Sequence, residues 1–223
     1  MLDELEKLYD EGEFEQVELE CKKLLRQNPD DIGVLELLAD ALGANEKFKK
    51  SIEVCEKGLS KDPSNPLFFS RMGDSYMNLE NLDKATEFLK KSIEIRPDDA
   101  TTLTTLAMVY QELEDWDNAF EMIEKAEKVS PDDTIVLEMK ARLISESDNW
   151  KDALPIVERI LKMDPENPTT ITLLGDIRIL EGELDEAEKL FLKARELDPE
   201  IDGIDEAFKQ INEFRKGKFK FNI

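Results

Sequence analysis

The sequence predicts an all-α fold in which one helix pair is repeated along the chain, and three observations lead to this prediction. Prolines recur every 34 residues, and six occurrences at one period identify an internal repeat: Pro29, Pro63, Pro97, Pro131, Pro165 and Pro199. Apolar residues within each repeat follow the i, i+3, i+4, i+7 spacing of an amphipathic helix. Small residues also recur at fixed places, as at Ala85, Ala119, Ala153 and Ala187, which indicates that helix backbones approach closely there.

Each repeat is expected to contain two helices joined by a short polar turn. In the repeat that ends at Pro131, residues 103–110 carry the apolar stripe of the first helix and residues 119–126 that of the second. The turn lies at residues 114–115, and the second helix ends near the periodic proline, which cannot extend it. Asp-Asp follows three of the prolines. These carboxylates suit the start of the next helix, as caps and as partners of the positive end of its dipole.

The period continues once more after Pro199 as a single helix, which we expect over residues 202–215. Its apolar stripe consists of Ile204, Ala207, Phe208, Ile211 and Phe214. A stack of helix pairs leaves its last apolar face open, so this helix is expected to act as a C-terminal cap. Lysines alternate with phenylalanines in residues 216–223. Two interpretations of this basic, aromatic tail stay open: a disordered terminus, or a segment that docks into a groove of its own chain or of a neighbour.

The helix pair resembles the tetratricopeptide repeat (TPR), whose period is 34 residues. The fourth repeat carries the resemblance most fully, through Leu103, Leu106, Ala107, Tyr110, Trp116, Ala119, Ile123, Ala126 and Pro131. The resemblance covers residues 1–201 as six repeats, and it implies a right-handed superhelical solenoid of antiparallel helix pairs. Lys140 and Arg178 depart from the pattern because they take positions that are normally apolar. Pro155 also departs from it, and we expect it to lie inside the second helix of the fifth repeat and to kink that helix.

Charge and composition exclude several classes of function. The chain has 223 residues, a formal net charge of −23 and no histidine. His-based acid–base catalysis, Ser-His-Asp triads and His-ligated zinc are therefore excluded. An acidic surface repels phosphate, which argues against a nucleic-acid partner, and two cysteines are too few for a disulfide framework or a four-thiolate metal site. We expect no enzyme, no cofactor and no metal.

Catalytic and targeting signals are also missing from the sequence. It contains no Gly-rich phosphate loop, no GxSxG motif and no EF-hand spacing. The N-terminus is acidic rather than basic and apolar, and no run of 18 apolar residues occurs. We therefore expect a cytoplasmic protein without a membrane partner.

The resemblance implies a site on the first helices, which in this family line a concave groove that generally takes an extended peptide or a helix. The residues expected to face that groove are Glu6, Glu36, Asp40, Ser70, Asp74, Met77, Thr104, Met108, Gln111 and Arg142. Glu36 and Asp40 share one helix face, and Asp74 is expected beside Asp40 on the next helix. Together these carboxylates can hold a Lys or Arg of a partner and steer it to the site. The alternative is a solvated face on a protein that is acidic everywhere.

Two further features of the groove carry expectations. Met77, Met108 and Met139 are 31 residues apart, which predicts a diagonal stripe able to adapt to apolar partners, although packing between helices is the favoured interpretation. Some family members bind the C-terminal carboxylate of chaperones through a Lys and Asn cluster. Only Arg71 among the matching positions could serve in that way, so no such binding is expected.

The sequence thus predicts a non-enzymatic protein-interaction scaffold that binds a peptide or helix with basic residues in an acidic groove. One alternative is a scaffold that self-assembles through the basic C-terminal tail or the terminal repeats. Another is an enzyme that uses the groove carboxylates, with or without a divalent metal.

Overall fold

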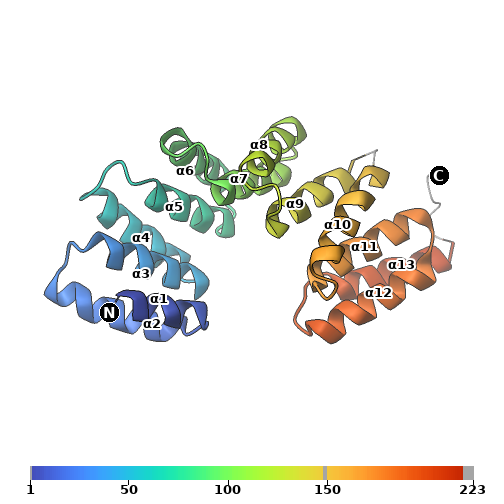
Figure 1. Cartoon of the computed structure of the whole chain (residues 1–223), viewed down its shortest axis with the longest axis horizontal. Helices are drawn as coiled ribbons and strands as arrows, with labels where there is room; N and C mark the ends of the chain where they lie inside the picture. Colours follow the sequence, from blue (N-terminus) through green and yellow to red (C-terminus); the bar gives the residue numbers. More distant parts are fainter. Residues whose placement is uncertain (1, 148–149, 218–223) are drawn as a thin grey trace. The chain divides into compact units, whose positions relative to one another are not determined.

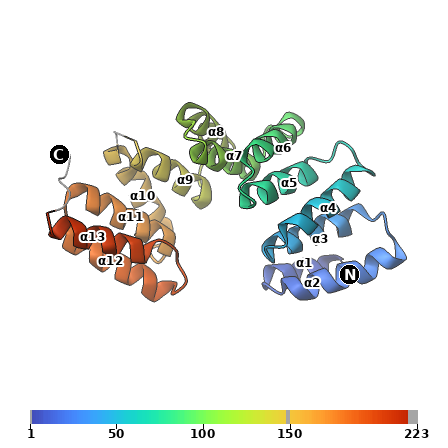
Figure 2. The same cartoon turned by 180° about the vertical axis from the view of Figure 1, so that it is seen from behind.

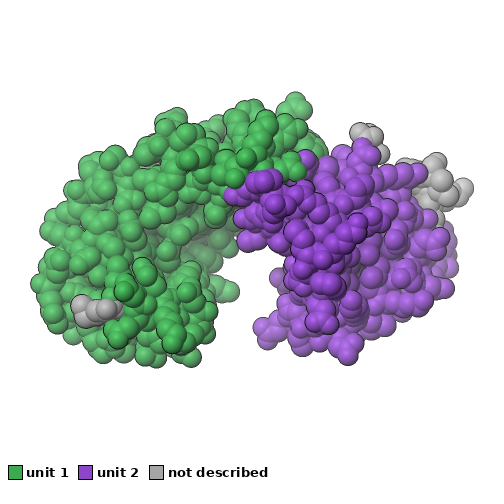
Figure 3. All heavy atoms as spheres, in the orientation of Figure 1, with its two compact units in different colours: residues 1–129 green, residues 130–223 purple. Residues whose placement is uncertain are grey.

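The computed structural model describes residues 2–147 and 150–217, and every regular element within them is a helix. The chain divides into two compact units, residues 1–129 (unit 1) and residues 130–223 (unit 2), as Figure 3 shows. The helices of unit 1 are α1 (Leu2–Asp10), α2 (Phe14–Gln27), α3 (Ile32–Ala44), α4 (Phe48–Leu59), α5 (Pro66–Asn78), α6 (Leu82–Ile95), α7 (Ala100–Glu112) and α8 (Trp116–Val129). Those of unit 2 are α9 (Thr134–Ser145), the 3₁₀ helix η1 (Trp150–Ala153), α10 (Leu154–Met163), α11 (Pro168–Glu181), α12 (Leu184–Leu197) and α13 (Ile204–Arg215). The predicted all-α fold class is confirmed.

Consecutive helices form the pairs that the 34-residue period predicts (Figures 1 and 2). Unit 1 contains the pairs α1–α2, α3–α4, α5–α6 and α7–α8, while in unit 2 α9 packs on η1 and α10, and α11 packs on α12. First helices also touch one another: α3 and α7 each contact α5, and α9 contacts α11. Residues about one period apart therefore lie on neighbouring first helices, and this places distant side chains together.

Small residues lie where two helices meet most closely. A Cβ atom at Gly73 on α5 would stand 2.5 Å from Cγ of Leu89 on α6. A Cβ atom at Gly175 on α11 would stand 2.8 Å from the ring of Phe191 on α12. The periodic alanines of the second helices are fully buried. The close approach predicted from these small residues is confirmed.

An Asp or Asn residue caps the first helix of five successive pairs. A side-chain oxygen of Asp31 accepts a hydrogen bond from a backbone N–H of α3 at 3.3 Å, and Asp99 does the same for α7 at 3.0 Å. Asp133, Asn65 and Asn167 cap α9, α5 and α11 in the same way. The expected capping by the Asp-Asp pairs is therefore confirmed, with the second Asp as the cap, and each cap contributes about 1 kcal/mol.

The turn inside the helix pair uses a residue in the left-handed region. Gly12 and Gly182 adopt a φ of 81° there, which glycine does easily, but Glu46, Glu80 and Glu114 are held at φ 57–58°. A side chain in this region costs about 1 kcal/mol. Packing of the pair, rather than the preference of the turn residue, therefore fixes the turn.

Pro155 does not lie in the interior of an α-helix, and that part of the prediction was wrong. The second helix of the fifth repeat opens as η1, and the α-helical part begins only at Leu154. Pro155 therefore lies in the first turn of α10. Backbone N–H groups there have no α-helical partner, so proline removes no hydrogen bond of the α-helix.

A basic residue near the end of the second helix fastens it to the preceding loop. Nζ of Lys57 donates to the carbonyl of Pro29 at 2.5 Å, and Nη2 of Arg159 donates to the carbonyl of Pro131 at 3.1 Å. The same bond recurs one period after Arg159, from Lys193. The carbonyls of three periodic prolines are thus satisfied by the next repeat.

The last helix, α13, covers the apolar side of α12. Its buried residues, packed in one cluster with Phe191, are Ile204, Ala207 and Ile211. Arg215 at its end forms ion pairs with Asp185 at 2.5 Å and Glu188 at 2.7 Å, both on α12. Of the predicted basic tail, residues 216–217 are described, and residues 218–223 lie outside the described part of the chain.

Candidate functional site

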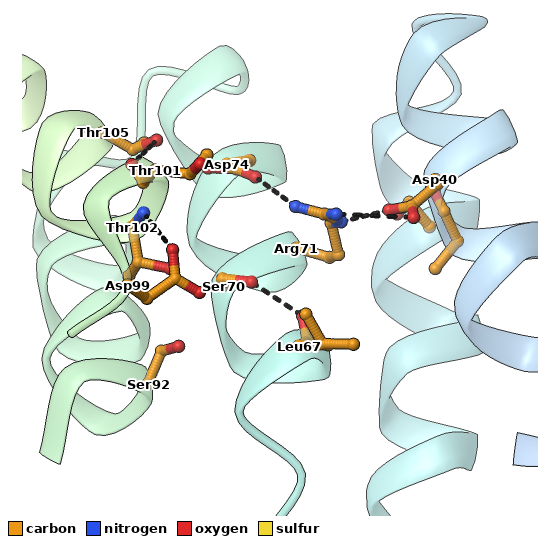
Figure 4. Close-up of polar contacts among 12 residues, drawn as sticks. Asp40, Leu67, Ser70, Arg71, Asp74, Ser92, Asp99, Thr101, Thr102 and Thr105 are labelled. Atoms are coloured by element: carbon orange, nitrogen blue, oxygen red, sulfur yellow. Dashed lines mark hydrogen bonds and ion pairs between the residues drawn. The ribbon is translucent and has the colours of Figure 1, made fainter. Parts of the chain in front are cut away.

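Three neighbouring first helices of unit 1 bring together polar residues from distant parts of the sequence. Asp40 lies on α3, Arg71 and Asp74 lie on α5, and Thr105 lies on α7 (Figure 4). Because α5 contacts both α3 and α7, these side chains form one row across three repeats. The two predicted aspartates do lie on adjacent helices.

Arg71 lies between the two aspartates. Its Nε and Nη2 donate to the two carboxylate oxygens of Asp40, with a distance of 3.4 Å from Nη2 to Oδ2 (Figure 4). Its Nη1 stands 3.7 Å from Oδ2 of Asp74. The chain's own guanidinium therefore occupies the place between Asp40 and Asp74. Asp40 is bound through both oxygens, whereas Asp74 is only loosely paired.

Sequence reasoning considered Arg71 only as an isolated carboxylate-binding residue and missed this pairing. The signal was present in the spacing, because Arg71 follows Asp40 by 31 residues, the interval of the methionine stripe. Two residues separated by one repeat period minus one helical turn lie on neighbouring first helices, one turn apart. Their side chains can therefore meet diagonally between the two helices.

The carboxylate of Asp74 is incompletely compensated by its surroundings. Desolvation raises its pKa to about 6. Arg71 and a hydrogen bond from Thr105 lower the pKa, while the charges of Asp40 and Asp99 raise it. The side chain is nevertheless 33% exposed. Near neutral pH Asp74 therefore presents an accessible negative charge that an additional cation would stabilise.

A cleft of about 230 Å³ opens beside this row. Its lining includes Tyr9 of α1, Asp40 of α3, and Arg71, Asp74 and Asn78 of α5. Desolvation raises the pKa of Tyr9, and the charge of Asp40 adds to this effect, so its phenol keeps its proton. Small-molecule sites usually enclose about 300–1,000 Å³. This cleft therefore has the size to hold one side chain of a partner rather than a whole substrate.

The two predicted glutamates differ in their availability. Glu36 is half-buried on α3 and accepts a hydrogen bond from Nδ2 of Asn65 at 2.7 Å. Its carboxylate is thus engaged by the residue that caps α5. Glu6 lies on α1 and is exposed.

Ser70 and Thr104 lie too deep to meet a partner. They are 4% and 3% exposed. Their hydroxyl groups donate within their own helices, to the carbonyls of Leu67 at 2.9 Å and Ala100 at 2.8 Å. Both residues therefore pack between first helices, and we do not include them in the candidate site.

The methionines separate into two kinds. Met77 on α5 and Met108 on α7 are half-buried, as is Gln111 on α7. Met139 on α9 is only 5% exposed, so packing, the favoured interpretation of the stripe, is confirmed at this residue.

Arg142 belongs to unit 2 and is therefore described apart from the row of unit 1. It lines a separate cleft of about 980 Å³ together with Asp176 of α11. Desolvation raises the pKa of Asp176 to about 6, with Arg142 lowering it and Glu146 raising it.

Within residues 2–147 and 150–217, no group of three Asp, Glu, Cys or His residues is placed to hold a metal ion. In the same part, no helix combines the length and the apolar character needed to cross a membrane.

Two models of known families match the chain. A family model described as the N-terminal TPR repeats region of Psidin matches residues 38–170, more than half of the chain. A tetratricopeptide repeat model matches residues 146–205. The search of curated proteins gives no match.

Several solved structures share the fold at low sequence identity. A chain of the APC/C hetero-tetramer Cut9-Hcn1 is 14% identical with a TM-score of 0.84, covering 95% of this chain and 42% of that one. This chain thus spans less than half the length of that relative. A tetratricopeptide repeat protein from Parabacteroides merdae is 18% identical, with a TM-score of 0.76 and coverage of 95% and 82%. The pilF protein of Pseudomonas aeruginosa is 17% identical, with a TM-score of 0.74 and coverage of 97% and 95%.

The family match and the fold agree with the repeat read from the sequence. Tetratricopeptide repeats are in general non-enzymatic scaffolds for protein interaction, and this general role is supported here. The solenoid predicted from the sequence is the architecture that the solved relatives share. The chain belongs to the tetratricopeptide repeat family.

Proposed function

We propose that this chain is a non-enzymatic scaffold that binds a peptide or helix through a basic side chain placed at Asp74. The observation that carries the proposal is an accessible, incompletely compensated carboxylate at the edge of a cleft sized for one side chain. A lysine or arginine in that cleft would lower the pKa of Asp74, because its positive charge offsets the cost of desolvating the carboxylate.

Asp74 is the favoured anchor because Arg71 does not satisfy the two aspartates equally. Both oxygens of Asp40 bind the guanidinium, whereas Asp74 stands 3.7 Å from it. One guanidinium between two carboxylates also leaves the row with a net charge of about −1 at neutral pH. A partner cation at Asp74 would complete the alternation of charge along the row.

Other features of the molecule support a basic partner that also carries apolar residues. The net charge of −23 attracts a basic segment from a distance and speeds its encounter with the site. The half-buried Met77 and Met108 lie on α5 and α7, next to the row, and methionine adapts its shape to varied apolar side chains. The enzyme alternative has less support, since the cleft beside the carboxylates is smaller than a usual substrate pocket.

The test uses a random peptide library selected on the purified wild-type chain. Selected peptides should carry Lys or Arg at a fixed position, and their affinity should fall about tenfold or more on Asp74→Asn, since a charged hydrogen bond contributes about 1.5–3 kcal/mol. The matched control is Asp98→Asn, which removes the same charge from an exposed turn and should leave affinity nearly unchanged. Equal binding to wild type and Asp74→Asn, or selection of peptides without basic residues, would overturn the proposal.

A further inference from the structure

The cleft of about 980 Å³ in unit 2 has its own chemistry and is separate from Asp74. Its walls come from the end of α9, one face of α11, and the loop that leads into the first half of α13. Its acidic residues are Glu146, Asp176, Asp198, Glu200, Asp202 and Glu206. Arg142 is the single basic residue in its lining. The cleft therefore attracts cations.

The same cleft also offers apolar surface. Leu173, Ile179, Leu180, Ile201 and Ala207 contribute to the lining. Most of the accessible apolar surface comes from Leu180, which is 41% exposed, and from the half-buried Ile201, because the other three residues are buried. Apolar surface beside carboxylates suits a segment that carries both aromatic and basic side chains. A purely charged ligand would leave the apolar part uncovered, at a loss of about 25 cal/mol for each Å².

This chain contains one segment with that composition. Residues 218–223 hold two lysines and two phenylalanines in alternation and no acidic residue, in a chain whose net charge is −23. Its lysines match the carboxylates of the cleft in charge, and its phenylalanines match the apolar lining.

The end of α13 is built so that this segment can turn back. Gly217 has a φ of 70°, and its N–H donates to the carbonyl of Phe214 at 2.9 Å, a left-handed turn of the kind that ends helices. From Gly217 back to Gln210, at the cleft, is about 10 Å along the helix axis. Six extended residues span up to about 20 Å, so the segment has the length to reach the cleft.

We propose that residues 218–223 dock into the acidic cleft of unit 2 of their own chain. The segment then acts as an internal ligand that any other basic peptide has to displace from this cleft. Self-association is the competing arrangement, in which the segment enters the cleft of a second copy.

A spin label at position 222 tests the docking in the full-length chain. Cys21 and Cys55 are buried, and desolvation raises their pKa to about 11 and about 12, so both stay unreactive toward thiol reagents at neutral pH. The label on Asn222→Cys therefore attaches at one place. Amide NMR signals of Leu180 and Ile201 should lose about half or more of their intensity, because tethering gives the segment an effective concentration in the millimolar range.

Two controls separate docking from mere tethering and from self-association. The variant Asp176→Lys with Asp202→Lys should restore those signals, whereas Asp152→Lys with Glu158→Lys, both exposed and outside the cleft, should not. Equal broadening in both double variants would show tethering alone and would overturn the proposal. Self-association is tested by mixing spin-labelled chains with isotope-labelled chains that carry no spin label. Broadening that appears only in this mixture would place the segment in the cleft of a second copy, and this result would also overturn the proposal.

Discussion

Replacing Asp74 by asparagine should stabilise unit 1 at neutral pH. Burial raises the pKa of this carboxyl from 3.8 to about 6, a difference of about 2 units, and each unit is worth about 1.4 kcal/mol. The full shift corresponds to about 3 kcal/mol, but water screens a side chain that is 33% exposed, which reduces our expectation to about 1 kcal/mol. The substitution keeps the shape of the side chain and removes the desolvated charge.

The sign of the pH dependence follows from the direction of the shift. Since the folded state binds this proton more tightly than the unfolded state, the group lowers stability as pH rises from about 4 to about 6. The advantage of Asp74→Asn should therefore be complete at pH 7.5 and about half as large at pH 5.0. Both values lie above the sequence pI of about 4.4, which keeps the protein soluble.

The assay is urea unfolding at pH 5.0 and 7.5, followed by the fluorescence of Trp116 in a Trp150→Phe background. Trp116 opens α8 and reports on unit 1, which matters because repeat proteins need not unfold in one step. A lower stability of Asp74→Asn at pH 7.5 would refute the reasoning. Asp40→Asn is the contrast, since it leaves Arg71 with its loose partner alone and should destabilise by about 1.5–3 kcal/mol.

Three further tests of the fold, with five substitutions, also use urea unfolding. Glu80→Gly removes a side chain from a φ of 58° and should stabilise by about 0.5–1 kcal/mol. Gly182→Glu, at a φ of 81° in unit 2, is followed by Trp150 in a Trp116→Phe background and should destabilise by about 1 kcal/mol; a change in the same direction for both would contradict the strain argument. Gly73→Ala forces a Cβ against Leu89 and should destabilise by about 1–3 kcal/mol, whereas Gly43→Ala, with free space around it, should not destabilise; similar losses in both would argue against close packing. Asn65→Ala removes the cap of α5 together with the hydrogen bond to Glu36 and should destabilise by about 1 kcal/mol or more; no change would show that the cap is dispensable.

The fold could be predicted from sequence because each structural requirement of the repeat leaves its own residue type at a fixed interval. Gly73 and Ala85 mark close helix contacts, and Asp31 and Asp99 mark helix starts. Pro155 was misjudged for the opposite reason. The effect of a proline depends on its distance from the first α-helical residue, and the 3₁₀ turn that shifts this start to Leu154 leaves no recognisable pattern.

The candidate site could be predicted only in part, because the 34-residue period relates only residues at equivalent positions of the repeats. It correctly placed Asp40 and Asp74 on adjacent helices, but Arg71 meets Asp40 from a different position of the repeat. The prediction that Ser70 and Thr104 face the groove failed for a related reason. Ser70 precedes Asp74 by four residues and Thr104 precedes Met108 by four, which is only about 40° around the helix axis, and the repeat pattern does not resolve so small a difference.

Arg71 also determines how the proposed site would recognise its partner. Its guanidinium joins α3 to α5 through Asp40, so it contributes to the stacking of the second and third repeats. The same guanidinium excludes a second cation from the space between the two aspartates. Within this row, a partner can therefore gain a charge interaction only at Asp74, with one basic side chain. Recognition of one cation provides little discrimination by itself, so the apolar contacts around Met77 and Met108 have to supply the selectivity among basic peptides.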